Sequence, residues 1–273
     1  MPSHPPLEGA LDLEQWMPRA SCGTRREGTQ KNVGLLRMLN GLDLFSGIGG
    51  LTVALAPWVR PIAYCEQDRF AQSVLLSRMA KSDLPCAPIW DDVRTLRGGM
   101  LPGPPDVIYG GFPCQDISVA GDGVGLGGSR SGLFFEVIRL ICELRPRFVF
   151  LENVPAITVR GLDRVLLELT SLGYDCRWTI VSAAEMGAPH LRERWWLLAH
   201  SVDHTLRGRH GTSQGEVLTR RNGTLNPGRW SAEPDVGRVA HGVSLRVDRL
   251  RGLGNAVVPA CAREAFERLM GLK

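Results

Sequence analysis

The sequence predicts an α/β protein with a doubly wound, mixed β-sheet and a small loop-rich lobe. Short apolar runs of strand length alternate with segments whose apolar residues recur at helical spacing, a pattern typical of this class. A glycine-rich turn joins the first apolar run to the first helical segment. Polar residues follow the ends of several runs, where open α/β sheets bind their ligands.

The composition allows one large domain with a small additional lobe. The chain has 273 residues, of which 44% are hydrophobic, so a sizeable core is expected. No apolar run has the length of a membrane span, and the first residues lack the basic-then-apolar pattern of a signal peptide. The seven cysteines form no CxxC pair, which argues against a disulfide framework or a zinc site. We therefore expect a cytoplasmic protein that needs no metal.

The net charge of +4 permits polyanion binding without requiring it. Nearly all the basic residues are arginine, which suits bidentate contacts with phosphate and guanine. A GC-rich coding sequence explains that preference better as a whole.

The predicted sheet opens with a strand at residues 39–45 and a turn, Ser46-Gly47-Ile48-Gly49-Gly50, before a helix at 51–56. Glycines let a ligand approach the backbone, and a helix N-terminus offers free N–H groups. This arrangement is typical of nucleotide-binding folds, although many glycine turns bind nothing. Its spacing, GxGG, differs from the GxGxxG of dinucleotide enzymes.

Two acidic residues follow the next two predicted strands. Glu66 ends a strand at 61–65, about 20 residues after the glycine turn, where a carboxylate can accept both hydroxyls of a ribose. A solvated loop carboxylate is the alternative. An amphipathic helix is predicted at 68–80. A third strand is predicted near 89–93, and Asp92 lies near its end, where an adenine amino group can be met.

The stretch from Asp106 to Ser118 organises the site. A buried strand at 107–109 is followed by two glycines, then by Pro113 and Cys114. A thiol where a strand ends and a loop begins is placed for nucleophilic chemistry, and a buried structural cysteine is the alternative. The glycine-rich segment 121–128 predicts a mobile lid over a substrate, or an ordinary surface loop.

A central apolar strand at 147–151, after a helix at 133–144, leads into Glu152. Burial there raises the pKa of a carboxyl group and makes Glu152 a candidate acid, with a salt-bridged structural glutamate as the alternative. Arg192 and Arg194 alternate with Glu193, so an extended segment directs both to one face, where they suit a phosphate or a carbonyl oxygen. A surface ion-pair ladder with Glu193 is the alternative.

The remaining segments complete the domain organisation. A helix at 162–172, strands at 174–181 and 195–199, and a helix from about residue 260 are predicted. Residues 1–36 read as a partly disordered extension and 37–200 as the main domain. Residues 201–242 are polar, basic and loop-rich, suited to phosphates and base edges, and 243–273 return to the main domain.

Five of these stretches, in order from about Leu39 to the C-terminus, resemble motifs of the DNA cytosine-5 methyltransferases. DLFSGIGGL resembles the cofactor-binding motif, GFPCQDIS the catalytic proline–cysteine motif and ENV the carboxylate motif. LRERWWLLA is similar to the QxRxR motif and RGLGNAVVP to the closing GN-[AS]-V motif. The resemblance implies a Rossmann-like methyltransferase fold using S-adenosylmethionine, with S-adenosylhomocysteine as product.

The family's chemistry implies that Cys114 adds to C6 of a cytosine flipped out of duplex DNA. Glu152 would hold N3 and supply a proton, and Arg194, more weakly Arg192, would hold the base carbonyl or the backbone. The implied cofactor contacts are Phe45, Ser46, Gly47, Gly49, Gly50, Glu66, Asp92, Leu133, Asn255 and Val257. The expected DNA contacts are Gln115, Ser118, Arg130, Arg207, Arg209, Arg220 and Arg221.

Departures from the family pattern shape the expected specificity. His190 stands where the family usually has glutamine, and the recognition region is short, as in compact phage and restriction-linked bacterial enzymes. The short region predicts a short target sequence or loose specificity. A monomer and a cognate restriction endonuclease as partner also fit that resemblance. The alternatives are a tRNA cytosine methyltransferase, which usually carries a CFT tripeptide absent here, and an inactive DNA-binding relative. A nicotinamide oxidoreductase fails on the glycine spacing and leaves Cys114 without a role.

Overall fold

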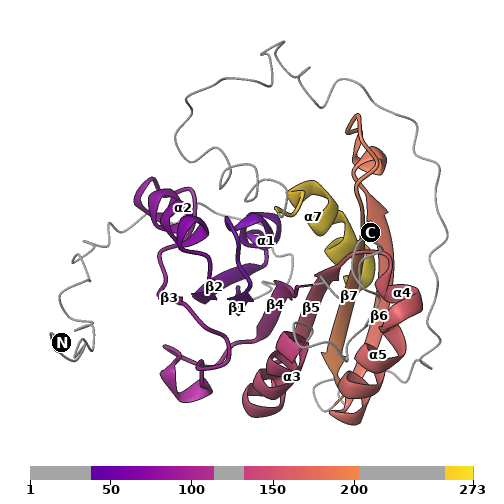
Figure 1. Cartoon of the computed structure of the whole chain (residues 1–273), viewed down its shortest axis with the longest axis horizontal. Coiled ribbons are helices and arrows are strands. Elements are labelled where there is room, and N and C mark those ends of the chain that lie inside the picture. The colour runs from indigo at the N-terminus through magenta and orange to yellow at the C-terminus, as the bar shows by residue number, and fades with distance from the viewer. Residues whose placement is uncertain (1–37, 114–131, 203–255, 273) are drawn as a thin grey trace, which may run out of the picture. The chain divides into compact units, whose positions relative to one another are not determined.

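A seven-stranded mixed sheet with helices on both faces confirms the predicted fold class (Figure 1). The computed structural model describes residues 38–113, 132–202 and 256–272. The strand order is β3-β2-β1-β4-β5-β7-β6, and only β7 runs antiparallel to its neighbours. The strands are β1 (Leu39–Leu44), β2 (Val59–Cys65), β3 (Ile89–Trp90), β4 (Val107–Gly111), β5 (Phe148–Asn153), β6 (Tyr174–Ser182) and β7 (Glu193–Ser201).

The central strands are mostly apolar because helices cover both of their faces. In β4, Ile108 packs with the helices α3 (Gly132–Leu144) and α5 (Leu162–Ser171). The adjacent Tyr109 points to the opposite face and packs with α1 (Gly50–Leu55) and α7 (Pro259–Met270). The C-terminal helix therefore completes the core beside the first helix of the fold.

A bulge lets β2 contain a proline. The pairing of β1 with β2 shifts register between Gly41 and Leu42, so that Gly41 faces Pro61 while Leu42 faces Ala63. Proline cannot donate a hydrogen bond, and in sheets it is confined to edges and bulges. A Cβ on Gly41 would lie 2.6 Å from a ring carbon of Tyr109, so the glycine makes room for that ring.

Several predicted boundaries differ from the structure. The third strand covers only Ile89–Trp90, and β7 runs from Glu193 to Ser201 rather than 195–199. Helix α2 (Arg69–Ala80) buries only Ala71 and Leu75, which is less than the expected amphipathic face. Three short helices escaped sequence analysis because each spans one turn or less: η1 (Gly98–Met100), α4 (Ile157–Arg160) and η3 (Ala184–Met186).

Candidate active site

The candidate site lies at the carboxyl ends of the parallel strands. The ends of such strands meet at one edge of the sheet, where open α/β folds bind ligands. The glycine turn follows β1, Glu66 follows β2 and Asp92 follows β3. Gly111 ends β4, and Glu152 lies beside it on β5. The residues expected to meet a cofactor and those expected to meet a base thus come from adjacent strands.

The glycine turn is left-handed at three of its positions. Phe45, Gly47 and Gly49 have φ values of 53°, 52° and 83°. Only Phe45 carries a side chain there, and such a strained conformation persists where its surroundings hold it. Ser46 contributes by donating its hydroxyl to the Asp43 carbonyl over 2.8 Å. A Cβ on Gly47 would meet no heavy atom within 4 Å, so this part of the turn is open to an approaching ligand.

The Glu66 side chain is hydrogen-bonded to the glycine turn. One carboxylate oxygen accepts the Gly47 N–H over 2.7 Å and the other accepts the Asp68 N–H over 2.7 Å. Each carboxylate oxygen has a second acceptor position. The geometry is therefore compatible with the two ribose hydroxyls expected at this position.

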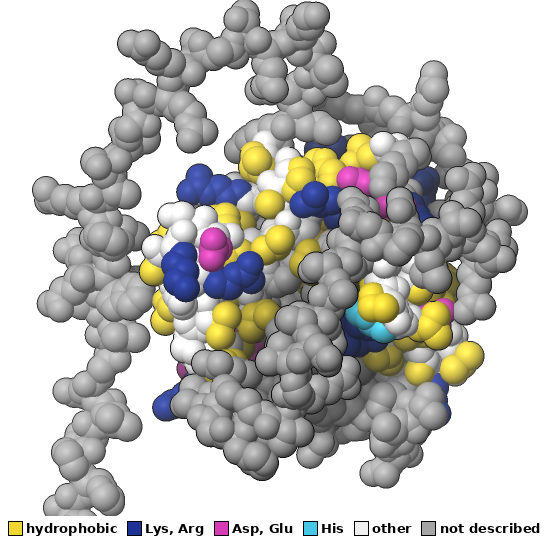
Figure 2. Space-filling view, turned by 90° about the horizontal axis from the view of Figure 1, so that it is seen from above, with side chains coloured by type: hydrophobic (Ala, Val, Ile, Leu, Met, Phe, Trp, Pro, Cys, Tyr) yellow, Lys and Arg dark blue, Asp and Glu magenta, His cyan; other side chains and the backbone are white. Residues whose placement is uncertain are grey.

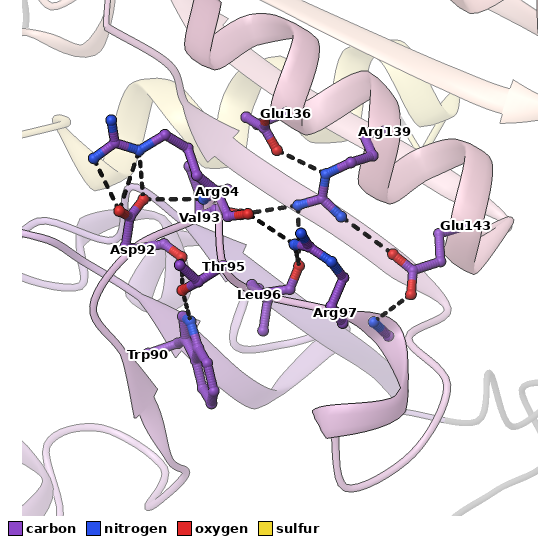
Figure 3. Close-up of polar contacts among 11 residues, drawn as sticks. Trp90, Asp92, Val93, Arg94, Thr95, Leu96, Arg97, Glu136, Arg139 and Glu143 are labelled. Carbon is purple, nitrogen blue, oxygen red and sulfur yellow. Dashed lines mark hydrogen bonds and ion pairs between the residues drawn. The ribbon is translucent and has the colours of Figure 1, made fainter.

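Asp92 is occupied by its neighbour Arg94 (Figure 3). The Arg94 guanidinium contacts both carboxylate oxygens at 2.9–3.1 Å, and the Arg94 N–H also donates to Oδ1 over 3.0 Å. These hydrogen bonds lower the pKa of Asp92. An open polar pocket beside it is lined by Gln67, Arg69, Gln72, Asp91 and Asp92. An adenine amino group that used Asp92 would share it with Arg94 or displace Arg94.

Helix α3 anchors the loop that follows Asp92. The Arg139 guanidinium donates to the carbonyl oxygens of Val93 and Leu96 at 2.9 and 3.0 Å, while Glu143 accepts the Gly98 N–H over 2.7 Å (Figure 3). Leu133, at the start of the same helix, packs against the core. One helix therefore supports two of the expected cofactor contacts.

The end of β4 is joined to the end of β5. Gly111 pairs with Glu152, and the amide of the buried Asn153 donates to the Phe112 carbonyl over 3.3 Å. A Cβ on Gly111 would lie 2.5 Å from Glu152 Oε2, so glycine is required for the carboxylate to occupy this place. The chain that leads to Cys114 thus ends its strand directly beside Glu152.

Glu152 forms an ion pair with Arg194 at 2.9 Å between Oε1 and Nε, and the Glu152 side chain is only 14% exposed. Burial raises the pKa of Glu152, and the nearby charges of Arg194 and Arg192 offset part of that rise. A buried carboxyl group with a raised pKa beside a cation is an arrangement that suits a group that donates a proton and takes it back.

Arg192 differs from the extended geometry expected for it. It lies before β7 with φ of 30°, so the alternation that was to direct both arginines to one face does not apply. Its guanidinium Nη2 donates to the Ala256 carbonyl over 2.6 Å. Val257, the next residue, lies against Gly50, where an added Cβ would be 3.2 Å from the Val257 carbonyl oxygen.

Some expected site residues lie outside the described ranges. They are Cys114, Gln115, Ser118, Arg130, Arg207, Arg209, Arg220, Arg221 and Asn255, together with the glycine-rich segment 121–128. On the described surface, Figure 2 shows basic side chains in separate groups with apolar and neutral ones between them. Within residues 38–113, 132–202 and 256–272, no cluster of three or more His, Cys, Asp or Glu residues is arranged to hold a metal ion. No helix in those ranges is long and apolar enough to cross a membrane.

Four further residues support the site through their contacts, and these roles were not predicted from the sequence. They are Asp43, Thr52, Gly111 and Asn153. Asp43 is fully buried on β1, and burial raises its pKa to about 8. Its Oδ2 accepts the Thr52 hydroxyl over 2.6 Å, and the Thr52 and Tyr109 hydroxyls lie 2.9 Å apart. An aspartate inside an apolar strand was the available signal, because a carboxylate is rarely buried without a purpose.

Comparison with known proteins identifies a matching family. The family described as C-5 cytosine-specific DNA methylase matches residues 39–227. The type II methyltransferase M.CviJI of Paramecium bursaria Chlorella virus IL3A is 35% identical over 229 residues, covering 84% of this chain and 58% of that protein. M.HhaI of Haemophilus parahaemolyticus is 31% identical over 167 residues, covering 59% of this chain and 49% of that protein. The chain therefore spans about half the length of the curated relatives it matches.

Solved structures agree with the fold. A structure described as a DNA modification methyltransferase encoded within an E. coli prophage has a TM-score of 0.51 and 30% identity, covering 62% of this chain and 48% of that one. The DNMT2 of Spodoptera frugiperda, at 19% identity, has the same TM-score and covers 69% and 56%. The second likeness concerns the fold alone.

Proposed function

This chain belongs to the C-5 cytosine-specific DNA methylase family, and we propose that it transfers a methyl group from S-adenosylmethionine to C5 of a cytosine in duplex DNA. The observation that carries the proposal is the pairing of Gly111 with Glu152. It places the strand leading to a cysteine beside a buried acid that is itself paired with an arginine. Addition of a thiol to a pyrimidine ring requires an acid and a cation beside it, and the described residues supply these two next to the strand that leads to Cys114.

In the proposed mechanism, the Cys114 thiolate forms a bond to C6 of the cytosine while Glu152 gives a proton to N3. The electron pair of the ring double bond becomes available at C5, which makes that carbon a nucleophile. Bound S-adenosylmethionine supplies the methyl group to C5 from its sulfonium. A base, for which a water molecule suffices, then removes the C5 proton. The sulfur–carbon bond breaks, and Cys114 and Glu152 return to their starting states.

Arg194 has two roles in this proposal. Its ion pair with Glu152 fixes the carboxyl group against the site, and its charge keeps the ionised form of that group accessible after proton donation. A guanidinium beside the base also offsets negative charge on the cytosine carbonyl oxygen. The raised pKa of Glu152 supports the acid role, because it favours the protonated form before the reaction.

The glycine turn and the two acidic residues form the proposed cofactor site. The open space at Gly47 suits the methionine half of the cofactor, and Glu66 suits its ribose. Residues 201–242 would read a short DNA sequence, and the enzyme would act as a monomer in the cytoplasm. The type II methyltransferases among its relatives support modification alongside a restriction endonuclease.

The test measures tritium transfer from labelled S-adenosylmethionine to duplex DNA, with tRNA as the comparison substrate. We expect DNA to be labelled, and Cys114→Ser to abolish labelling while cofactor binding persists. Duplex DNA containing 5-fluorocytosine at the target should trap a covalent complex, because fluorine at C5 prevents the final elimination. Labelling of tRNA alone, or full activity of Cys114→Ser, would contradict the proposal. Bisulfite sequencing of host DNA then gives the target sequence.

A further inference from the structure

The contact between Arg192 and Ala256 joins two parts of the molecule that are distant in sequence. Ala256 belongs to the last stretch before α7, and its carbonyl accepts the Arg192 guanidinium over 2.6 Å. A charge-assisted hydrogen bond of this length is among the stronger polar contacts in proteins. It fixes the position of a segment that has no regular structure of its own from residue 256 to residue 258.

The same segment packs on the glycine turn. A Cβ on Gly50 would lie 3.2 Å from the carbonyl oxygen of Val257 and 3.4 Å from its Cβ. Gly50 is the first residue of α1 and follows the open position at Gly47. Any shift of residues 256–258 therefore changes the packing at the start of α1, next to the expected cofactor.

Arg192 is itself firmly held. The carbonyl of Leu191 accepts the Ala183 N–H over 2.8 Å, and Arg192 then adopts a φ of 30° before β7 begins. Residues in such a sparsely populated conformation persist only when their surroundings determine it, and they gather at functional sites. The charge of Arg192 also offsets part of the rise that burial causes in the pKa of Glu152.

We propose that Arg192 is a positioning residue that holds residues 256–258 against the glycine turn and thereby shapes the cofactor site. The proposal rests on the function proposed above. It assigns Arg192 a different task from Arg194, because Arg194 forms an ion pair with Glu152 whereas Arg192 donates to the carbonyl of a residue in the C-terminal segment. Loss of Arg192 should weaken cofactor binding before it affects the chemistry on the base.

Arg263 provides a matched control. It lies on α7, and its guanidinium donates to the Ala54 carbonyl over 3.2 Å, so it too attaches the C-terminal segment to α1 through a backbone oxygen. It differs from Arg192 in holding the far end of α1 rather than the glycine turn. Arg192→Met and Arg263→Met each remove one guanidinium and keep an apolar stem of similar shape.

The experiment measures the Kd for S-adenosylhomocysteine by calorimetry without DNA, the KM for S-adenosylmethionine, kcat on duplex DNA, and the thermal midpoint. We expect Arg192→Met to raise the Kd and the KM about tenfold, consistent with loss of a hydrogen bond to a charged group. The fall in kcat should be smaller than the rise in KM. Arg263→Met should keep the Kd for S-adenosylhomocysteine within about twofold of the wild-type value. Arg192→Lys, which retains a cation, should fall between wild type and Arg192→Met.

Three results would overturn the proposal: wild-type cofactor affinity in Arg192→Met with a loss confined to kcat, an equal loss of affinity in Arg263→Met, or no difference between lysine and methionine at position 192. If Arg192→Met does not fold, the comparison of Arg192→Lys with Arg263→Met decides in the same way. Because the Kd is read without DNA or turnover, a failure of the proposed methylation leaves this measurement interpretable.

Discussion

Two buried carboxyl groups of the sheet have opposite neighbours. Asp43 on β1 lies beneath the glycine turn, and Glu152 on β5 lies beside the end of β4. Burial is the largest cause of the raised pKa of both groups. The Thr52 hydroxyl only partly offsets the effect at Asp43, and the charge of Glu66 adds to it. At Glu152 two arginines oppose the effect.

The comparison shows that burial alone does not make a reactive acid. Asp43, with a pKa of about 8, stays protonated at neutral pH and forms a fixed polar contact with Thr52. Glu152 has a cation 2.9 Å away, whose charge favours the ionised form against the effect of burial. In the proposed site, Asp43 would act as a support on the cofactor side, whereas Glu152 would serve proton transfer on the base side.

The largest expected effect concerns Asp43 and stability. Its folded pKa of about 8 lies above the ordinary value of 3.8, so the folded protein binds a proton that the unfolded chain has released. The free energy of unfolding therefore falls as pH rises between these values, by about 1.4 kcal/mol per unit and on the order of 5 kcal/mol in total. Asp43→Asn should lack this slope and match or exceed wild-type stability near pH 8. Urea unfolding from pH 5 to 8 measures the difference.

A control separates this effect from general charge removal. Asp106→Asn also removes one carboxylate, whose Oδ2 accepts the Asn40 N–H over 2.8 Å. A difference between wild type and Asp43→Asn that stays constant from pH 5 to 8 would show that Asp43 is ionised in the folded protein, and the comparison with Glu152 would then fail.

The next effect concerns Glu152 and rate. Glu152→Gln keeps the shape of the side chain but cannot deliver a proton, so methyl transfer should fall by about 10²–10⁴-fold. The affinity for S-adenosylhomocysteine should hardly change. In the wild type, the rate should decline as pH rises through the raised pKa of Glu152, because the protonated acid is lost. Single-turnover methylation across pH tests both points, and an unchanged rate in the variant would exclude Glu152 as the acid.

Gly111→Ala tests the position of Glu152 while both acids remain in the sequence. The new Cβ would be 2.5 Å from Glu152 Oε2 and would displace the carboxyl group from its pairing with Arg194. A misplacement of about 1 Å can reduce a rate by about 100-fold, so we expect a loss of roughly 10–100-fold in methyl transfer. Gly103→Ala, whose Cβ would meet nothing within 4 Å, is the matched control. Equal activity of the two variants would show that the place of Glu152 is not critical.

The order of strands and helices could be read from the sequence, because most of the strands contain an apolar run and most of the connections contain glycine or proline. The positions of Glu66, Asp92 and Glu152 at or after the ends of strands were predicted from the apolar runs that precede them. The roles of Gly111 and Asp43 could not be read, since they depend on contacts between strands that only the register fixes. The contact of Arg192 with Ala256 joins residues 64 positions apart, beyond any local pattern.

The smallest effect concerns the Asp92–Arg94 pair on the cofactor side. Arg94 has 59% of its side chain exposed, and exposed ion pairs contribute little because water and salt screen them. Arg94→Ala should free Asp92 for an adenine amino group and tighten S-adenosylhomocysteine binding by no more than about fivefold. Asp92→Ala should weaken it, since alanine has no side-chain oxygen to accept a hydrogen bond from that amino group. If cofactor binding weakens in Arg94→Ala, Arg94 holds Asp92 in place for the cofactor rather than competing with it. Calorimetric titration at low and high salt distinguishes these cases, because competition from an exposed ion pair diminishes as salt increases.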